Sequence, residues 1–476
     1  MSGTYHTLGA STLAGSGNRP DQTNHLAKRH NAKSISQSPS LLMSDYWFLA
    51  GLILALFYVA DPFFWRLDKI GPTKHLPLII SILGVLLANV GSQVFDSTKS
   101  SLKHNWQILQ AGLPLVLLGL WIVVGSLYTR KFNDINNTFI TVGLYMLFAF
   151  LAARIVLISP ARASIVRAYL ISAATLGIFM VMRMATNYDG MSVNYHELEA
   201  LIIPLAVYFA LRPSGLNSPL NLQNNDKRYS QVLFTLFFLG AGLVFRKNTG
   251  FLVLLLTLLY IWIAEWRFRF RENIAFRFWT MFWVLIVLVG GVVAAGYFAQ
   301  QQELLPSGNP EYRMLTYDVA WHKFMSSPIW GTSFTGQATE KFTAYTISSA
   351  HGNLATHSDI LDIAAQGGII ALSLWLWGYL RVARLSLRHA LKGDRPREDM
   401  QAAAHTLACM SIASIIVYAF NPILLQPAKS LLMWGQFGML LGISLHLANQ
   451  NAEAKTKAAG SDAANTHLST VELSHA

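Results

Sequence analysis

The sequence predicts an all-α polytopic membrane protein with about twelve transmembrane helices and one long external loop that contains short helices. Three observations predict this class. Of the 476 residues, 53% are hydrophobic and only 13% are charged, which is about half the charged fraction of a soluble domain. The mean hydropathy is +0.38. Apolar runs of about 20 residues, long enough to cross a bilayer as a helix, recur along most of the chain.

The composition also excludes several classes of protein as descriptions of the whole chain: a disordered chain, a collagen-like fibre, a disulfide scaffold and an ordinary cytosolic enzyme. Cys409 is the single cysteine, so no internal disulfide can form. The 36 basic and 24 acidic residues give a net charge of +12. In a membrane protein, Lys and Arg at the bases of loops are the usual cause of such an excess, so no nucleic-acid partner is expected.

Each predicted span is an apolar run bounded by polar residues. The twelve runs are 46–65, 76–94, 108–128, 138–158, 164–183, 194–211, 231–245, 250–264, 279–298, 359–380, 403–420 and 429–447. The seventh and eighth are short, and only residues 246–249 separate them. These two runs are therefore expected to form either a tight hairpin or two half-helices.

Three regions follow from this pattern. Residues 1–40 are polar and rich in Ser, Asn, Gly and His, and are predicted to be a disordered cytoplasmic tail. Residues 41–450 form the predicted transmembrane domain, which includes a long external loop at 299–358. Residues 451–476 are predicted to be a second disordered cytoplasmic tail. No signal peptide is expected before the first span, which is long enough to remain as an anchor.

Basic residues predict the orientation of these spans. The connections 265–278 and 381–402 are rich in arginine, so both are expected in the cytoplasm. The loop 299–358 lies one span away from each of them and falls on the opposite face, and twelve spans place both termini in the cytoplasm. The short loop 66–75 is also basic, which favours the opposite assignment at the N-terminal end.

The loop 299–358 contains two candidate functional residues. The stretch EYRMLTYDVAWHKFM at 311–325 has the apolar spacing of a helix lying at the membrane surface. It carries Arg313, whose planar guanidinium suits phosphate oxygens, although pairing with Glu311 or with lipid headgroups is an alternative. His357 ends the loop, just before a span that Ser358 or Asp359 is placed to cap.

An imidazole such as that of His357 has an unperturbed pKa of about 6.5 and can accept a proton from a hydroxyl at neutral pH. The alternative is a histidine at the interface that makes one structural hydrogen bond. Arg246 and Lys247 are a third candidate, because two adjacent cations on the same face could attract a diphosphate. Ordinary snorkelling of basic side chains at a loop base is the alternative there.

The run NYHELE at 194–199 places three ionisable side chains near the start of the sixth span: His196, Glu197 and Glu199. Ionisable groups near a bilayer face the protein interior or a wet cavity and usually have a partner. These residues are therefore predicted either to bind an acceptor or to form structural pairs, with Arg246 or Arg183 as partners for the two glutamates.

The stretch HSDILDIAAQGGIIAL at 357–372 resembles the signature of the O-antigen ligase and O-antigen polymerase superfamily. That signature has a His, a Leu four residues later and a Gly eleven residues later, which correspond to His357, Leu361 and Gly368. Upstream, Arg313-x3-Tyr317 followed by Pro328-x2-Gly331 resembles the family's Arg-x3-aromatic and Pro-x2-Gly segment.

Two further segments extend the resemblance over most of the chain. NYHELEALIIPLA at 194–206 is similar to the family segment that precedes a Pro-containing span. RKNTGFLVLL at 246–255 lies where the family usually has Ser-Arg-Gly or Ser-Arg-Thr-Gly, with the basic residues placed earlier. Twelve helices with a long external loop near the C-terminal third also match.

The resemblance implies metal-independent glycosyl transfer at the periplasmic face of the bacterial inner membrane. The donor would be a glycan on undecaprenyl diphosphate, and the acceptor a sugar hydroxyl on a glycan or on lipid A-core. His357 would act as the general base or orient the acceptor, and Arg313, with Arg246 or Lys247, would hold the diphosphate. No cofactor is expected. Membrane lipids and other polysaccharide export proteins are candidate partners.

The family's architecture serves three activities: polymerisation of polysaccharide repeat units, ligation of O-antigen to lipid A-core, and O-linked transfer of oligosaccharide to protein. The HSD form of the motif at His357, in place of the HN form associated with ligases, favours polymerisation. A different class of protein, a twelve-helix secondary transporter, would show similar halves and ionisable residues at mid-membrane. The two halves of this sequence show no such similarity.

Overall fold

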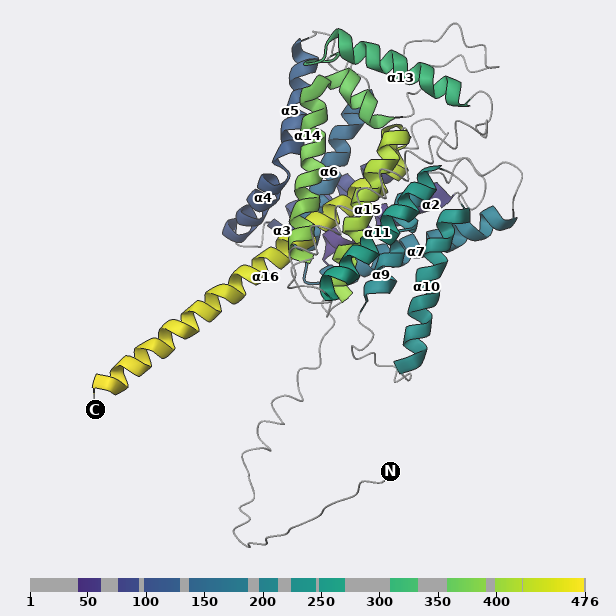
Figure 1. The fold of residues 1–476 in the computed structure, drawn as a ribbon. Coiled ribbons are helices and arrows are strands. Elements are labelled where there is room, and N and C mark those ends of the chain that lie inside the picture. The colour runs from purple at the N-terminus through teal and green to yellow at the C-terminus, as the bar shows by residue number, and fades with distance from the viewer. Residues whose placement is uncertain are drawn as a thin grey trace, which may run out of the picture. The chain divides into compact units, whose positions relative to one another are not determined.

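The computed structural model describes residues 42–60, 76–93, 98–128, 137–186, 197–212, 224–244, 248–269, 309–332, 358–390, 399–421 and 423–474. Every regular element within these ranges is a helix (Figure 1). They are α2 (Met43–Ala60), α3 (Leu76–Gln93), α4 (Thr98–Ala111), α5 (Leu113–Tyr128), α6 (Asn137–Ile158), α7 (Arg162–Thr186), α8 (Glu199–Ile202), α9 (Leu205–Leu211), α10 (Asn224–Val244), α11 (Asn248–Arg269), α13 (Asn309–Ser326), α14 (Asp359–Ala390), α15 (Asp399–Phe420), the 3-10 helix η5 (Ile423–Leu425) and α16 (Pro427–Ser474).

Described helices overlap eleven of the twelve predicted spans, the sixth of them only as two short helices, and the remaining span, 279–298, lies outside the described residues. Five helical segments within the described ranges are long and apolar enough to cross a membrane: Arg162–Met182, Thr249–Arg267, Asp359–Leu387, Asp399–Phe420 and Pro427–Glu453. The pair Lys103–Ala111 and Leu113–Gly125, bent by 74°, passes the same test as one broken span. The total of twelve spans therefore stays a prediction.

The sixth predicted span, 194–211, differs from expectation. Its described part, from Glu197 onward, contains two short helices, α8 and α9, and no continuous span. The break falls at Pro204, which has no N–H to donate to the preceding turn. The next two predicted runs are the long helices α10 and α11, which pack against each other, so the structure favours the hairpin over two half-helices.

The centre of the bundle is the contact between α6 and α16, which is the most extensive of any helix pair described. Small residues let the two backbones approach closely. A Cβ on Gly438 would collide with the carbonyl of Ala149, and one on Gly442 would lie 2.6 Å from the Ala153 carbonyl oxygen. This spacing of glycines four residues apart is typical of helix pairs packed inside membranes.

Helix α16 continues to Ser474 and is 48 residues long. The sequence predicts a disordered tail from residue 451, whereas the described chain is helical there. Residues 451–474 include several Ala, Lys and Glu residues, whose high helix propensity favours continuation of the helix. The other predicted tail, residues 1–40, lies outside the described residues.

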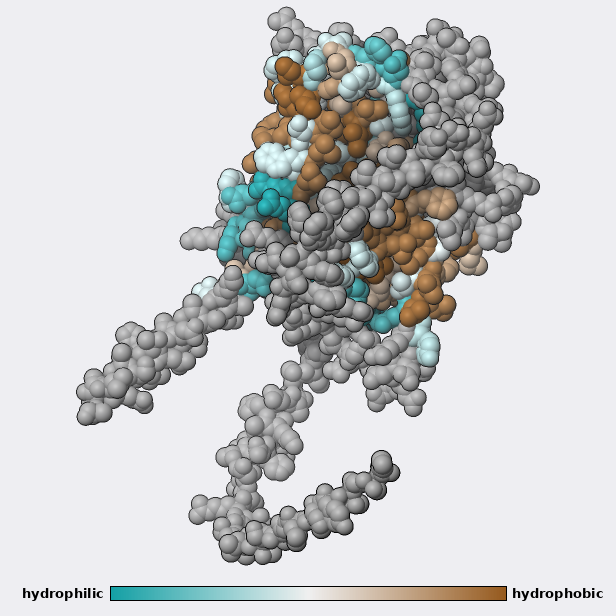
Figure 2. Space-filling model, in the orientation of Figure 1, coloured by the Kyte–Doolittle hydropathy of each residue, from teal (hydrophilic) through white to brown (hydrophobic). Residues whose placement is uncertain are grey.

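Large apolar side chains cover the outer surface of several helices (Figure 2). On α10, Val232, Leu233 and Leu236 are 57%, 67% and 61% exposed, and α5 exposes Leu120 and Val123 in the same way. Lipid-facing helices need such an apolar surface, because hydrocarbon offers no partner to polar groups. Together with the long apolar helices, this surface indicates a multi-pass membrane protein.

Candidate functional site

Helix α13 lies across one end of the bundle and covers the first turns of α14 (Figure 1). It begins at Asn309 and ends at Ser326, which confirms the helix predicted for 311–325. Ala320 of α13 is buried against Ala365 of α14, and Leu361 packs beside them. The long loop therefore supplies a helix that is fixed to the same segment that His357 precedes.

The turn that follows α13 inserts into a break in α14. At Gly368 the backbone of α14 leaves the helical conformation, with φ 68° and ψ −168°. In an unbroken helix the Ile369 N–H would donate to the Ala365 carbonyl. Instead, Ile369 donates to the Pro328 carbonyl at 2.8 Å, and the Ala365 carbonyl accepts from the Thr332 N–H at 3.0 Å. The turn thus replaces the hydrogen bonds that the break removes.

Two glycines make this insertion possible. Gly331 and Gly368 both have positive φ, at 63° and 68°. A Cβ on Gly331 would lie 2.5 Å from the Gln366 carbonyl, and one on Gly368 would collide with the Ile329 carbonyl. No L side chain fits at either position without moving the backbone. The Pro-x2-Gly segment and the glycine of the His motif are therefore two sides of one contact.

Side chains complete the contact between α5, α13 and α14. The Thr332 hydroxyl donates to Gln366 Oε1 at 2.7 Å. Trp121 of α5 donates from its indole nitrogen to the Gly367 carbonyl at 3.0 Å, and its ring stacks on Trp330 with centroids 5.1 Å apart. The break in α14 is thus held from both sides.

Arg313 lies on α13 and is half-buried. Its Nε is buried and makes no hydrogen bond with any described residue. Tyr317 lies one turn further along; burial raises the pKa of its phenol and the positive charge of Arg313 opposes that shift. A guanidinium held against the protein with a donor left over can bind an anion without first breaking an ion pair.

Four of the predicted site residues, His357, Arg246, Lys247 and His196, lie outside the described residues. The structure does describe the residues directly after His357. The Ser358 hydroxyl accepts from the Leu361 N–H at 3.3 Å, and its carbonyl accepts from the Asp362 N–H at 3.0 Å. Ser358 is therefore the N-cap of α14, one of the two residues predicted for that role.

Asp359, the other predicted cap, has a different role. Its carboxylate is buried and accepts the N–H groups of Ile423 at 2.7 Å and Leu424 at 3.1 Å, both in η5. The Ser430 hydroxyl donates to the Ile423 carbonyl at 2.7 Å. The start of α14 is thereby attached to the connection between α15 and α16.

Glu197 forms a buried ion pair with Lys429, with 2.6 Å between Oε2 and Nζ. The two side chains are 12% and 10% exposed. Glu197 has a φ of 88° and is the one non-glycine residue with positive φ in the described ranges. The sequence predicts pairing with Arg246 or Arg183, so Lys429 is a different partner from those predicted. The side chain of Arg183 is not among those described.

These contacts place a buried polar cluster, Glu197, Lys429 and Asp359, beside the N-terminus of α14; the carboxylates of Glu197 and Asp359 interact electrostatically. Glu199 is also fully buried, in α8. Sequence reasoning did not single out Lys429. The one signal was a lysine at the first position of an otherwise apolar run, which is costly in a membrane and implies a partner.

Within the described part of the chain, no three His, Cys, Asp or Glu side chains are placed to hold a metal ion. What the region offers is a guanidinium with an unused donor on α13 and a buried ion pair beside the start of α14. A guanidinium with an unused donor can stabilise a leaving diphosphate.

A protein-family match covers the region that contains α13 and the first part of α14. Residues 233–376 match a family model described as O-antigen ligase. The resemblance to the O-antigen ligase family is confirmed. The match runs from α10 through the break in α14 and includes Arg246, Lys247, Arg313 and His357. No curated protein matches the chain. The O-antigen ligase match supports an enzyme of the glycan-transfer type over the transporter alternative.

Proposed function

We propose that this protein transfers a glycan from undecaprenyl diphosphate to a sugar hydroxyl at the periplasmic face of the bacterial inner membrane. The observation that carries the proposal is the O-antigen ligase match over 233–376, which includes both Arg313 and His357. The attachment of α13 to α14 supports it, because α13 carries Arg313 and α14 begins directly after His357. The contact fixes the backbones of the two segments against each other.

In the proposed reaction the acceptor hydroxyl oxygen attacks the anomeric carbon of the donor glycan. The bond between that carbon and the diphosphate oxygen breaks, and undecaprenyl diphosphate leaves with the electron pair. His357 accepts the hydroxyl proton as general base. Arg313, with Arg246 or Lys247, binds the diphosphate and stabilises the charge that develops on it. His196, Glu197 and Glu199 remain candidates for acceptor binding, and the Lys429 pair supports a structural role for Glu197.

Among the activities of the family we propose polymerisation of polysaccharide repeat units, because the HSD form at His357 favours it. Ligation to lipid A-core is the nearest alternative, and O-linked transfer to protein is a third. The three differ in the acceptor, so the choice of acceptor is what an experiment must vary.

The test is reconstitution of the full chain in liposomes with lipid-linked repeat units, with and without lipid A-core. A ladder of products without the core supports a polymerase, and a product that requires the core supports a ligase. The variant His357→Ala is expected to abolish both the product and the release of undecaprenyl diphosphate. His322→Ala is the matched control, because His322 lies on α13 of the same loop and is 74% exposed. Equal loss of activity in both variants would contradict the role of His357.

A further inference from the structure

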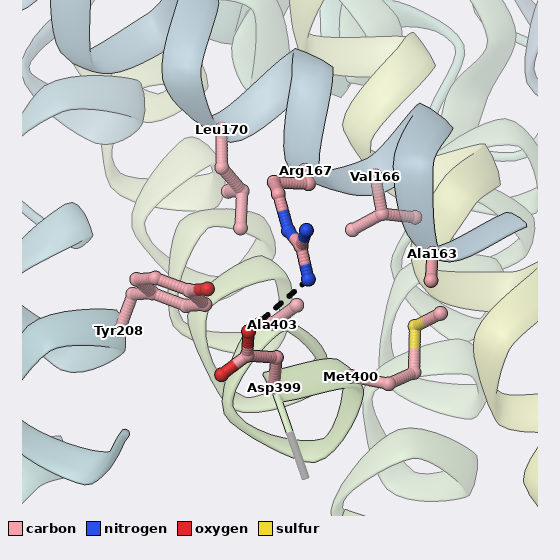
Figure 3. Close-up of a pocket in the computed structure, with 8 residues that line it drawn as sticks. All are labelled: Ala163, Val166, Arg167, Leu170, Tyr208, Asp399, Met400 and Ala403. Carbon is pink, nitrogen blue, oxygen red and sulfur yellow. Dashed lines mark hydrogen bonds and ion pairs between the residues drawn. The ribbon is translucent and has the colours of Figure 1, made fainter. Parts of the chain in front are cut away.

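A small hollow lies between α7, α9 and α15 (Figure 3). It is shallow, with a cavity volume of about 20 Å³. Five of its lining side chains are apolar and three are polar: Ala163, Val166, Leu170, Met400, Ala403, Arg167, Tyr208 and Asp399. An apolar wall beside a group of charged side chains suits a ligand that has both an apolar and a charged part.

Arg212 lies beside the hollow, paired with Asp399, and completes a charged group that has an excess of positive charge. Asp399 Oδ2 lies 3.2 Å from Arg167 Nη2, and Asp399 Oδ1 lies 3.1 Å from Arg212 Nε. Two guanidinium groups therefore share one carboxylate, which leaves a net charge of +1. Arg212 also lies over the Tyr208 ring, 5.6 Å from its centroid. Each guanidinium has five N–H donors, so both can bind a further anion while still paired with Asp399.

The hollow is far from the site of the proposed reaction. Asp399 is the first residue of α15, and the other end of α15 leads to η5, where Asp359 is bound. The 22 residues of α15 extend for about 33 Å. The hollow is thus at the opposite end of the bundle from α13, and it adjoins the basic connection 381–402 that is predicted to be cytoplasmic.

We infer that this hollow and the adjoining Arg212 bind the phosphate group of an anionic membrane phospholipid, with Arg167 and Arg212 on the phosphate and an acyl chain along the apolar wall. Guanidinium forks match phosphate oxygens in pairs. Basic pockets between helices at a membrane border bind anionic headgroups. Free phosphate would use only the polar half of the hollow. A lipid uses both halves, because Leu170, Val166 and Met400 line the hollow together with Arg167.

Native mass spectrometry of the full chain in detergent tests the inference, with titration of phosphatidylglycerol and of phosphatidylcholine. The wild type is expected to bind phosphatidylglycerol more tightly, and Arg167→Gln with Arg212→Gln to weaken that binding about fivefold for each charge removed. Arg384→Gln is the matched control, because Arg384 is an exposed arginine near the same end of the bundle. Equal loss in the control would overturn the inference, since it would show general attraction of anionic lipid to basic residues.

Two further measurements distinguish a lipid-binding site from a site for simple anions and from a structural group of ion pairs. Millimolar inorganic phosphate is expected not to displace the lipid, and full displacement would show a simple anion site and overturn the inference. Asp399→Asn keeps both arginines and removes the competing carboxylate, so binding of phosphatidylglycerol is expected to be equal or tighter. If Asp399→Asn loses binding as fully as the double arginine variant, the three residues are a structural ion-pair group and the inference fails.

Discussion

Arg313, which is half-buried, and Lys429, which is buried, are two cationic residues in different electrostatic situations. Lys429 has its charge matched by Glu197 at 2.6 Å, whereas the Nε of Arg313 is buried without a hydrogen bond to any described residue. A donor left over in a buried position costs free energy unless a ligand supplies the acceptor. Arg313 is therefore the better candidate to bind substrate, and Lys429 to hold the fold.

We predict that Arg313→Ala lowers the rate of glycan transfer about 10²- to 10³-fold, as removal of one charge-stabilising donor does in other enzymes. Arg313→Lys should recover only part of the rate, because an ammonium lacks the planar pair of donors. Initial rates of undecaprenyl diphosphate release in liposomes measure both effects. Lys323→Ala, on the same helix, is the control. Full activity of Arg313→Lys would show that charge alone is needed.

For the Glu197–Lys429 pair we predict a large effect on stability. Lys429→Ala leaves the Glu197 carboxylate buried without its partner, which costs about 3 kcal/mol in buried ion pairs. The double variant Lys429→Met with Glu197→Gln removes both charges and should recover most of that loss. Apparent melting temperatures in detergent measure the three proteins. A double variant as unstable as Lys429→Ala would show that the pair contributes packing and little electrostatics.

At the scale of helices, the contact between the turn after α13 and the break in α14 fixes α13, which carries Arg313, against α14, which begins after His357. We predict that Gly331→Ala or Gly368→Ala separates α13 from α14, because the added Cβ meets backbone atoms on the other side. Activity should fall while the helix content by circular dichroism stays unchanged. Gly143→Ala is the matched control, since a Cβ there meets no atom within 4 Å. Wild-type activity in Gly368→Ala would contradict this role for the contact.

The sequence predicts single helices well and their breaks poorly. Apolar runs of sufficient length locate α6, α7 and α15, because backbone groups in hydrocarbon must bond within the helix. The break at Gly368 depends on Pro328 and Thr332, some 40 residues upstream, which supply the missing hydrogen bonds. A Gly-Gly pair within an apolar run was the only local sign.

The same limit applies to the candidate site. The His motif and the Arg-x3-aromatic motif lie near each other along the chain, so the resemblance places Arg313 and His357 in one region. Glu197 and Lys429 are 232 residues apart, and no periodicity or spacing links them. Position alone predicts either Ser358 or Asp359 as the cap, and it does not show that the backbone N–H groups of η5 bind the Asp359 carboxylate.

At the scale of the whole molecule, the proposed chemistry requires no metal ion, because arginine and lysine side chains supply the positive charge at the leaving diphosphate. We therefore predict that a chelator such as EDTA leaves glycan transfer in liposomes unchanged. The comparison is with the same preparation given added magnesium. A strict need for magnesium would overturn the proposed mechanism.

The orientation of the chain is the other whole-molecule property that the proposed function needs, since the donor glycan must lie on the same side as α13. We predict that α13 is periplasmic and that the C-terminal part of α16 is cytoplasmic. Cys409, the one native cysteine, is fully buried and gives little background in thiol labelling. Single cysteines at two exposed positions, His322→Cys on α13 and Thr456→Cys on α16, then report the two faces.

A membrane-impermeant maleimide should label His322→Cys in spheroplasts, where the periplasmic face is open, and Thr456→Cys only after the membrane is permeabilised. Whether the number of spans between the two positions is even or odd decides whether the two cysteines lie on the same face of the membrane or on opposite faces. Three predicted spans, 359–380, 403–420 and 429–447, separate α13 from residue 456. An odd number places the two cysteines on opposite faces. Labelling of both from the outside would mean that one of these three helices does not cross the membrane. Labelling of His322→Cys only after permeabilisation would place α13 in the cytoplasm, where the proposed donor glycan is absent, and would contradict the proposed function.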